Sequence, residues 1–255
     1  FKETKSFGMI SSYDKFTDKI FVWSELQKNF MTTEYNIEPH RIFPIGSPRH
    51  DNWIMNKNFQ KSNKKIRVLI APTPITQLQG YDTTEIHIRF KNTIKNIILK
   101  LQDKNIELIF KIHPSQSDHN NEIRKIIETY SKKSSIYLFN PVKELIQTCD
   151  VIITITPEGW APSTIMLESM ILGKPALNII LDGKVYDFEY IKQNAAVATS
   201  YDSIDEILSN LIDNSEYRKK IGSNALLFSK QFLCNYGNSS KKIANFLTNK
   251  KQINA

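Results

Sequence analysis

From residue 66 onward, apolar strand-like runs alternate with helix-like segments, and this alternation constrains the fold more than any other feature of the chain. IRVLIAP at 66–72 and DVIITIT at 150–156 are rich in branched apolar residues, as expected for strands buried on both faces. TEIHIRFKNTIKNIILKLQ at 84–102 instead places its isoleucines at helical spacing. Strands separated by helices indicate βαβ units, so we expect an α/β fold with a doubly wound parallel sheet.

The same patterns predict the remaining elements of this domain. Pro141 stands where a helix would begin, a position that tolerates proline, and Gly173 stands where a helix would end. We expect strands at 66–72, 106–112, 135–140, 150–156, 174–180 and 195–200, and helices at 84–102, 121–133, 142–149, 163–173, 203–213, 215–233 and 239–249.

Residues 1–58 show a separate and shorter pattern of strand, helix and strand. One such unit cannot cover both faces of its own sheet, so we interpret it as the end of a partial second α/β domain at the N-terminus. The chain does not begin with methionine, and we expect it to be a fragment of a longer polypeptide. The predicted domains are 1–58, a βαβ remnant plus linker, and 59–255. The first domain has expected elements at 18–24, 25–36 and 41–46, before a polar, lysine-rich linker at 47–65.

Charge and cysteine content exclude several classes of protein. Lysine and arginine exceed aspartate and glutamate by 34 to 26, a formal charge of +8, but the excess is scattered and forms no basic arm. We therefore expect no nucleic-acid partner. The cysteines, Cys149 and Cys234, have neither zinc nor disulfide spacing, which favours a reducing compartment.

Without an apolar run of the ~20 residues that span a bilayer, we expect a cytoplasmic protein. Its basic charge suits peripheral association with the anionic inner face of the cell membrane.

The stretch ELIFKIHPSQ at 107–116 ends a predicted strand on His113, in front of Pro114. Ligands of doubly wound sheets bind at the carboxyl ends of the strands, near the point where the strand order reverses. A histidine at that edge can donate a hydrogen bond to a phosphate oxygen, and Pro114 fixes the exit of the chain. The alternative is a solvated strand end with no ligand, and the two residues alone do not decide between them.

A second candidate is the stretch TPEGWAPSTIMLESMILGKP at 156–175. Ser163 and Thr164 stand at the start of a predicted helix, where unpaired N–H groups and a partial positive charge attract anions. The alternative is that Ser163 serves only as the N-cap. Glu168 lies farther along the same helix. Its side chain would lie either on the solvent stripe or in a cleft, where it would accept hydrogen bonds from ribose hydroxyls.

A third candidate is IGSPRHD at 45–51, in which Gly46 breaks a strand and Arg49 follows. Arginine suits bidentate binding of phosphate or carboxylate. The alternative is a plain interdomain turn.

The chain lacks a P-loop, a GxGxxG fingerprint, a GxSxG elbow and an HExxH helix, so P-loop ATP hydrolysis, hydride transfer and serine hydrolysis have no support. A DxD-type metal handle is also missing, and we expect no metal.

Together these stretches resemble the C-terminal, nucleotide-binding half of GT-B-fold glycosyltransferases of bacterial-type surface polysaccharide biosynthesis. IFPIGSPRHD resembles the closing strand of the N-terminal domain in such proteins. KIHP resembles the His-Pro motif of bacterial sialyltransferases, Kdo transferases and CDP-glycerol glycerophosphotransferases. STIMLESMILGKPALNI resembles the helix-to-strand element of the same superfamily. The resemblance covers residues 18–230.

This resemblance implies roles for individual residues. The general base of inverting members belongs to the N-terminal domain, so the catalytic base is unknown. No cofactor is implied, because the nucleotide-activated sugar is itself the donor substrate. By resemblance, the donor nucleotide and its phosphates would be bound by His113, Pro114, Ser163, Thr164, Glu168 and Thr73, with Arg49 and Gly46 as phosphate or interdomain contacts.

The activity that the resemblance implies is transfer of a sugar or sugar-like group, or of glycerol phosphate, from a nucleotide-activated donor. A donor of the CMP or CDP type is favoured, with a surface polysaccharide or lipid-linked acceptor. A fragment carrying half of the cleft is expected to be inactive alone. Two alternatives stay open: a UDP-N-acetylglucosamine 2-epimerase-like isomerase, whose Asp-Ser-Gly-Gly run is absent here, and a non-catalytic module that binds a nucleotide or a partner.

Overall fold

The structure of the protein is a computed structural model. The predicted domain boundary between residues 58 and 59 lies outside the residues that it describes, and so stays a prediction. The described residues are 19–55, 65–73, 75, 84–102, 104–114, 117–131, 133–159 and 162–248, without the side chains of 117–119.

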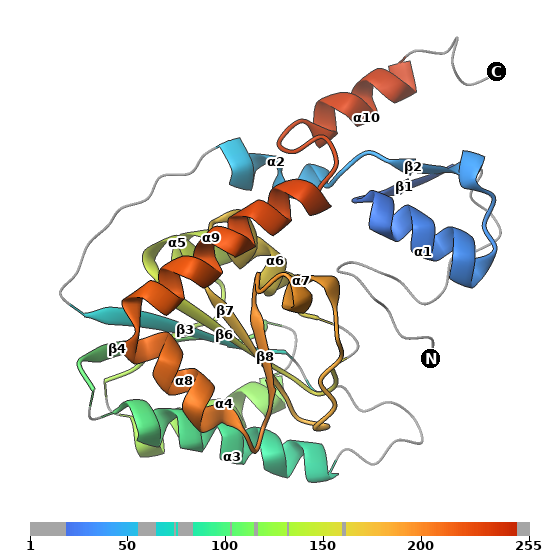
Figure 1. The fold of residues 1–255 in the computed structure, drawn as a ribbon. Coiled ribbons are helices and arrows are strands. Elements are labelled where there is room, and N and C mark those ends of the chain that lie inside the picture. The colour runs from blue at the N-terminus through green and yellow to red at the C-terminus, as the bar shows by residue number, and fades with distance from the viewer. Residues whose placement is uncertain are drawn as a thin grey trace.

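A six-stranded, fully parallel sheet forms the centre of the larger part of the chain (Figure 1). Its strand order is β5-β4-β3-β6-β7-β8, so the chain first builds outward from β3 and then crosses to its other side to begin β6. The order therefore reverses between β3 and β6, and the α/β prediction is confirmed. The strands are β3 (Ile66–Pro72), β4 (Ile106–Lys111), β5 (Ser135–Tyr137), β6 (Val151–Thr156), β7 (Ala176–Ile180) and β8 (Val197–Ser200).

Helices cover both faces of this sheet, as the apolar runs predict. Successive residues of a strand point to opposite faces, so Val68 belongs to one buried cluster with Phe90 of α3, whereas Leu69 belongs to the other with Met166 of α6. A one-turn helix, α7, was not predicted. On one face lie α3 (Thr84–Leu101), α4 (Ser117–Tyr130) and α8 (Ile204–Asp213), and on the other α5 (Val142–Thr148), α6 (Thr164–Ile171), α7 (Glu189–Lys192) and α9 (Ser215–Phe232).

The N-terminal unit is a separate parallel pair of strands with its own helix. The last helix of the described residues, α10, packs on this unit (Figure 1), because Phe246 lies with its ring centroid 5.2 Å from that of Phe21 and 4.9 Å from that of Phe43. The two ends of the described chain thus meet. The elements are β1 (Ile20–Val22), α1 (Glu25–Tyr35), the 3-10 helix η1 (Pro39–Arg41), β2 (Ile42–Pro44) and α10 (Ser239–Thr248).

The expected linker at 47–65 is wrong in its first part, because α2 (Pro48–Met55) is a helix. Proline fits the first helical position, where its missing N–H costs nothing. The buried residues of α2 are His50 and Asp51. A short helix that buries polar side chains shows no apolar periodicity, so the sequence pattern did not reveal it.

Asp51 explains why α2 is held in place. Its carboxylate accepts hydrogen bonds from the backbone N–H groups of Ser239, at 3.0 Å, and Ser240, at 2.6 Å, which begin α10. Burial alone would raise the pKa of Asp51, but the hydrogen bonds from Ser240 and Ser239 outweigh it and hold the pKa below its ordinary value. Asp51 is therefore a structural anion at the N-terminus of α10, where negative charge is favourable.

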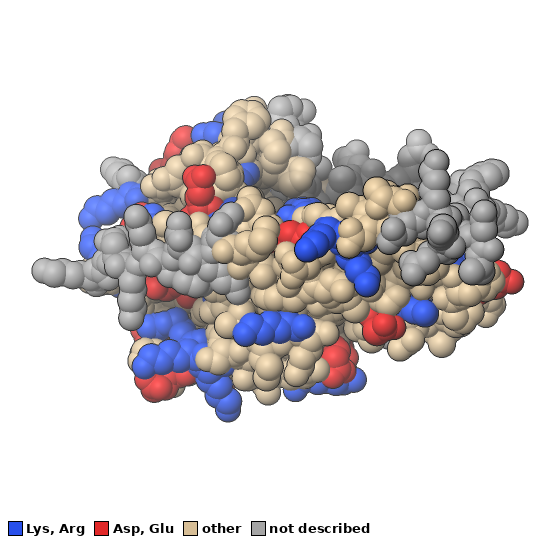
Figure 2. All heavy atoms as spheres, turned by 90° about the horizontal axis from the view of Figure 1, so that it is seen from above, with Lys and Arg blue, Asp and Glu red and all other residues tan. Residues whose placement is uncertain are grey.

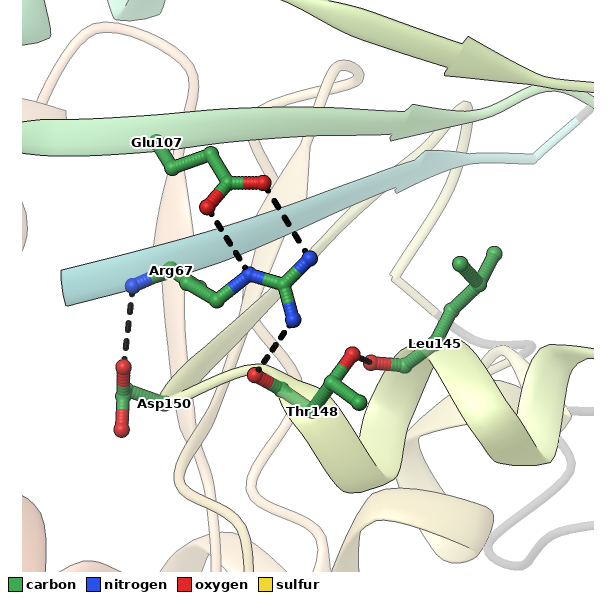
Figure 3. A network of polar contacts seen from close by, with 5 residues as sticks. All are labelled: Arg67, Glu107, Leu145, Thr148 and Asp150. Carbon is green, nitrogen blue, oxygen red and sulfur yellow. Dashed lines mark hydrogen bonds and ion pairs between the residues drawn. The ribbon is translucent and has the colours of Figure 1, made fainter. Parts of the chain in front are cut away.

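Arg67 organises the amino edge of the sheet (Figure 3). Its Nε and Nη2 donate to the two carboxylate oxygens of Glu107 at 3.0 and 3.1 Å, a bidentate pair between β3 and β4. Nη1 donates to the carbonyl oxygen of Thr148 at 3.2 Å, and the backbone N–H of Arg67 donates to Asp150 at 2.9 Å. These contacts lie at the opposite end of the strands from the ligand-binding edge of such folds. We therefore interpret the network as structural.

Candidate functional site

The carboxyl ends of β3 and β6 meet at the point where the strand order reverses, which is where ligands bind in open α/β sheets. Thr73 follows β3 directly, and its backbone N–H donates to the carbonyl oxygen of Ile155 in β6 at 2.8 Å. The Thr73 side chain is half-buried. The structure thus places this predicted site residue at the strand crossover.

The N-terminus of α6 follows β6 on the same edge. Ser163 occupies the N-cap position with an extended backbone, φ −61° and ψ 138°, yet its hydroxyl makes no capping hydrogen bond. Ser163 and Thr164 are both half-buried. The prediction of an N-cap position is right, but the hydroxyl is not used there. A bound anion could therefore take hydrogen bonds from this helix end.

His113 lies two residues beyond the end of β4, and its side chain is exposed. Its carbonyl oxygen accepts a hydrogen bond from the Asn120 side chain at 2.8 Å, so α4 fixes the backbone there. Although the side chain is exposed, neighbouring atoms partly desolvate the imidazole, which lowers the pKa of His113, and the charge of nearby Lys111 lowers it further. The imidazole is therefore neutral at pH 7 and has one N–H to donate. Pro114 follows, exposed on the same edge.

Lys111 ends β4 on the same edge of the sheet, and the sequence motifs did not point to it. It is 7% exposed, and its ammonium group donates to the carbonyl oxygens of Leu138, at 2.7 Å, and Ile112, at 3.1 Å. Burial lowers the pKa of Lys111. The side chain ties the end of β4 to the segment that follows β5. A single lysine inside the apolar run IELIFKI was the signal that could have identified it.

Glu168 is 2% exposed, so the solvent-stripe alternative is wrong. Its Oε1 lies 2.6 Å from Nη2 of Arg49 on α2. The same oxygen lies 3.7 Å from Nε2 of His50, which is fully buried, a distance too long for a hydrogen bond. The structure therefore brings together two predicted site residues, Arg49 and Glu168, from segments far apart in the sequence. The ribose contact proposed for Glu168 stays a prediction.

Gly46 lies at the turn after β2, with φ at +95°. A Cβ there would lie 2.0 Å from the carbonyl oxygen of Cys234, so the turn and the segment after α9 are in close contact. Only glycine adopts this conformation easily and leaves room for that contact. The position has a structural explanation; its predicted phosphate contact is untested.

Two acidic side chains mark the side of the edge nearer β7. The backbone N–H of Asp182 donates to the carbonyl oxygen of Pro157 at 3.0 Å, which holds the segments after β6 and β7 together. Burial raises the pKa of Glu158, and the charge of Asp182 raises it further. Negative charge there repels an anion, so phosphate would bind more favourably toward β3 and β4, the side of His113.

Within the described residues, no three histidine, cysteine, aspartate or glutamate side chains are grouped so as to hold a metal ion. The expectation of a metal-free site stays a prediction, because part of the chain lies outside the described residues. The helices of the described ranges include none long and apolar enough to cross a membrane.

Comparison with known proteins identifies the family. The family model of CDP-Glycerol:Poly(glycerophosphate) glycerophosphotransferase matches residues 4–249. The chain belongs to this family. The match confirms the resemblance to the CDP-glycerol glycerophosphotransferase branch, and it supports a transferase. No curated protein matches the chain significantly.

Several solved structures of other proteins share the fold of this member of the glycerophosphotransferase family. A glycosyltransferase from Rickettsia africae aligns with a TM-score of 0.60 at 13% identity, over 92% of this chain and 65% of that one. HepE of Anabaena in complex with UDP and glucose aligns with a TM-score of 0.59 at 13% identity, over 91% of this chain and 63% of that one. UDP-GlcNAc 2-epimerase from Neisseria meningitidis bound to UDP-GlcNAc aligns with a TM-score of 0.59 at 18% identity, over 90% of this chain and 61% of that one. The GT-B-type fold is confirmed, and the chain spans less than two thirds of each of these proteins.

Proposed function

We propose that this protein binds a nucleotide-activated donor, of the CMP or CDP type, at the carboxyl edge of its six-stranded sheet. It would take part in transferring glycerol phosphate, a sugar or a sugar-like group to a surface polysaccharide or lipid-linked acceptor. The observation that carries the proposal is the placement of Thr73, His113 and Ser163 on one edge, around the reversal of strand order, in a member of this family.

In this proposal the described residues stabilise the departing nucleotide phosphate. The neutral imidazole of His113 donates to a phosphate oxygen, and the first turn of α6, with Ser163 and Thr164, supplies further donors. Such fixed donors act on developing negative charge without reorganising during the reaction. The side chain of Arg49 is 59% exposed and would turn from Glu168 toward a phosphate. The carboxylate of Glu168 would then accept hydrogen bonds from the ribose hydroxyls. The catalytic base is not assigned.

A second candidate is an isomerase of the UDP-N-acetylglucosamine 2-epimerase type. Structural similarity to the Neisseria meningitidis epimerase, with a TM-score of 0.59, favours it. A non-catalytic module that binds a nucleotide or a partner is a third reading. The family match favours the transferase over both. The nucleotide base that the site prefers distinguishes the first two.

Isothermal titration of the full chain with CMP, CDP, UMP and UDP tests the proposal. We expect a cytidine nucleotide to bind more tightly than the corresponding uridine nucleotide. The reverse preference would favour the isomerase, and binding of none of the four would contradict all nucleotide-based readings.

His113→Ala is expected to weaken CDP binding by about 10- to 150-fold. The estimate is the loss of one hydrogen bond to a charged group, about 1.5–3 kcal/mol at 1.4 kcal/mol per tenfold change. His40→Ala is a matched control, because His40 lies on the N-terminal unit with its side chain 77% exposed. Circular dichroism checks that both variants fold. Unchanged affinity in folded His113→Ala would exclude the phosphate contact.

Peripheral association with the anionic inner face of the cell membrane, and hence a cytoplasmic location, remains part of the proposal, supported by the formal charge of +8. On the face seen in Figure 2, lysine and arginine are interspersed with acidic residues rather than gathered in one patch. Any attraction would therefore be weak and sensitive to salt. Sedimentation with phosphatidylserine-containing vesicles at low salt tests it, and protein that stays wholly in the supernatant would rule it out for this chain.

A further inference from the structure

Phe139 is the most exposed of the large apolar side chains in the described residues, at 82%. The next, Met55, is 66% exposed, at the end of α2. Exposed aromatic rings that stand alone are common, so exposure by itself indicates no function. The position of Phe139 in the fold is what gives it significance.

Phe139 stands on the ligand-binding edge, directly beside His113. The register of β4 and β5 pairs Lys111 with Tyr137, and the next backbone hydrogen bond runs from the N–H of Ile112 to the carbonyl oxygen of Tyr137, at 2.9 Å. His113 and Phe139 each follow two residues after this last pair. They therefore leave neighbouring parallel strands at the same level and on the same edge of the sheet.

The backbone that carries the ring is held by buried contacts. The ammonium group of Lys111 donates to the carbonyl oxygen of Leu138 at 2.7 Å, and Lys111 itself is 7% exposed. Pro141, two residues after Phe139, begins the turn into α5. The segment is thus fixed on both sides while the ring points away from the core, an arrangement suited to presenting a flat apolar surface.

The spacing of the strands sets the kind of ligand that fits this edge. From β5 to β6 there are three strand intervals, which amount to about 14 Å at the usual spacing. His113 lies one interval from Phe139, and the α6 N-terminus follows β6 at the far end. An aromatic surface at one end, with phosphate-binding donors along the rest, matches an extended nucleoside diphosphate with its base over Phe139.

We propose that Phe139 is the stacking platform for the nucleobase of the donor, beside the phosphate contact of His113. The inference rests on the proposed function, since it needs a nucleotide at this edge, and it deepens that function by assigning the base. Stacking accepts any base, because every base has a π face. The ring would therefore supply affinity for the nucleoside, and the choice of cytosine over uracil would come from polar groups around it.

Titration of the full chain with CDP and with inorganic pyrophosphate tests the platform. Phe139→Ala is expected to weaken CDP binding by about 5- to 150-fold, the usual range for one base stacked on an aromatic side chain. Pyrophosphate affinity should not change, because that ligand has no base. Phe139→Trp should keep CDP affinity within a few-fold of wild type. Leu227→Ala is the control, because Leu227 is another surface-exposed apolar side chain, 56% exposed, and lies on α9.

Tryptophan fluorescence gives an independent readout. The emission of Phe139→Trp should fall on addition of CDP, after subtraction of the change seen in the wild-type protein, because a stacked base quenches the indole. If wild type binds CDP and the affinity of Phe139→Ala equals that of the Leu227→Ala control, the platform is refuted and the proposed function survives. If Phe139→Ala loses pyrophosphate as strongly as CDP, or if added CDP leaves the Phe139→Trp emission unchanged, the base assignment is refuted. If wild type binds no nucleotide, the proposed function itself fails.

Discussion

Gly46→Ala is expected to destabilise the protein by about 2–5 kcal/mol, through two separate costs. At φ +95°, an alanine strains the backbone by about 1–2 kcal/mol. Its Cβ would also lie 2.0 Å from the carbonyl oxygen of Cys234 and 2.3 Å from Oγ of Ser239. The first of these is a main-chain atom, so the segment between α9 and α10 must move, and overpacking of this kind costs about 1–3 kcal/mol. Urea unfolding followed by circular dichroism measures the change.

Gly183→Ala is the matched control for this substitution. Gly183 has φ at +82°, but a Cβ there meets only Oγ of Ser200, at 3.7 Å, an ordinary contact. It therefore carries the backbone strain without the clash, and we expect a loss of about 1–2 kcal/mol. Equal losses in the two variants would contradict the close packing of the β2 turn on the segment after α9.

Glu168→Ala is expected to have the second large effect, because it removes a buried carboxylate that joins α6 to α2. Arg49 would lose its 2.6 Å partner and turn to solvent, while fully buried His50 would face a cavity. A charged hydrogen bond and a small cavity together amount to about 2–4 kcal/mol. The same urea unfolding measurement gives the loss.

Glu168→Gln separates the structural role of this side chain from its proposed role at the ribose. The amide keeps the shape but not the charge. We expect CDP affinity to fall about tenfold, the difference between a charged and a neutral hydrogen bond. Arg49→Ala removes the partner but leaves the carboxylate of Glu168 in place. A double-mutant cycle of Glu168→Gln and Arg49→Ala gives the coupling between the two side chains in the free energy of unfolding. If Glu168→Gln weakened the fold but left CDP affinity unchanged, Glu168 would be only a contact between α6 and α2.

The strand and helix pattern was accessible from the sequence because the sheet is buried on both faces. Runs such as Val151–Thr156, in which every residue is buried, leave a continuous apolar signal. The helix α3 buries one stripe, which gives the 3.6-residue period. The helix α2 gave neither signal, because its buried residues are polar. Nδ1 of His50 lies 2.8 Å from Oγ of Ser47, and the carboxylate of Asp51 accepts a hydrogen bond from the N-terminus of α10.

The candidate site was only partly accessible from the sequence. Local chemistry predicted the helix start at Ser163 and the strand end before His113, and both lie on the expected edge. The Arg49–Glu168 pair joins residues 119 positions apart, and a single sequence carries no signal for such a contact. Phe139 was overlooked for the same reason. Its place beside His113 follows from the β4–β5 register, which is a property of the folded sheet.

The central claim is that a nucleotide binds at the carboxyl edge of the six-stranded sheet. Backbone amide spectra of the isotope-labelled chain, recorded while CDP is added, test it most directly. We expect the largest shifts at Thr73, His113 and Thr164, and none at the amino edge around Arg67 and Glu107 (Figure 3). Saturable shifts confined to the amino edge, or no saturable shift at any position, would contradict the claim.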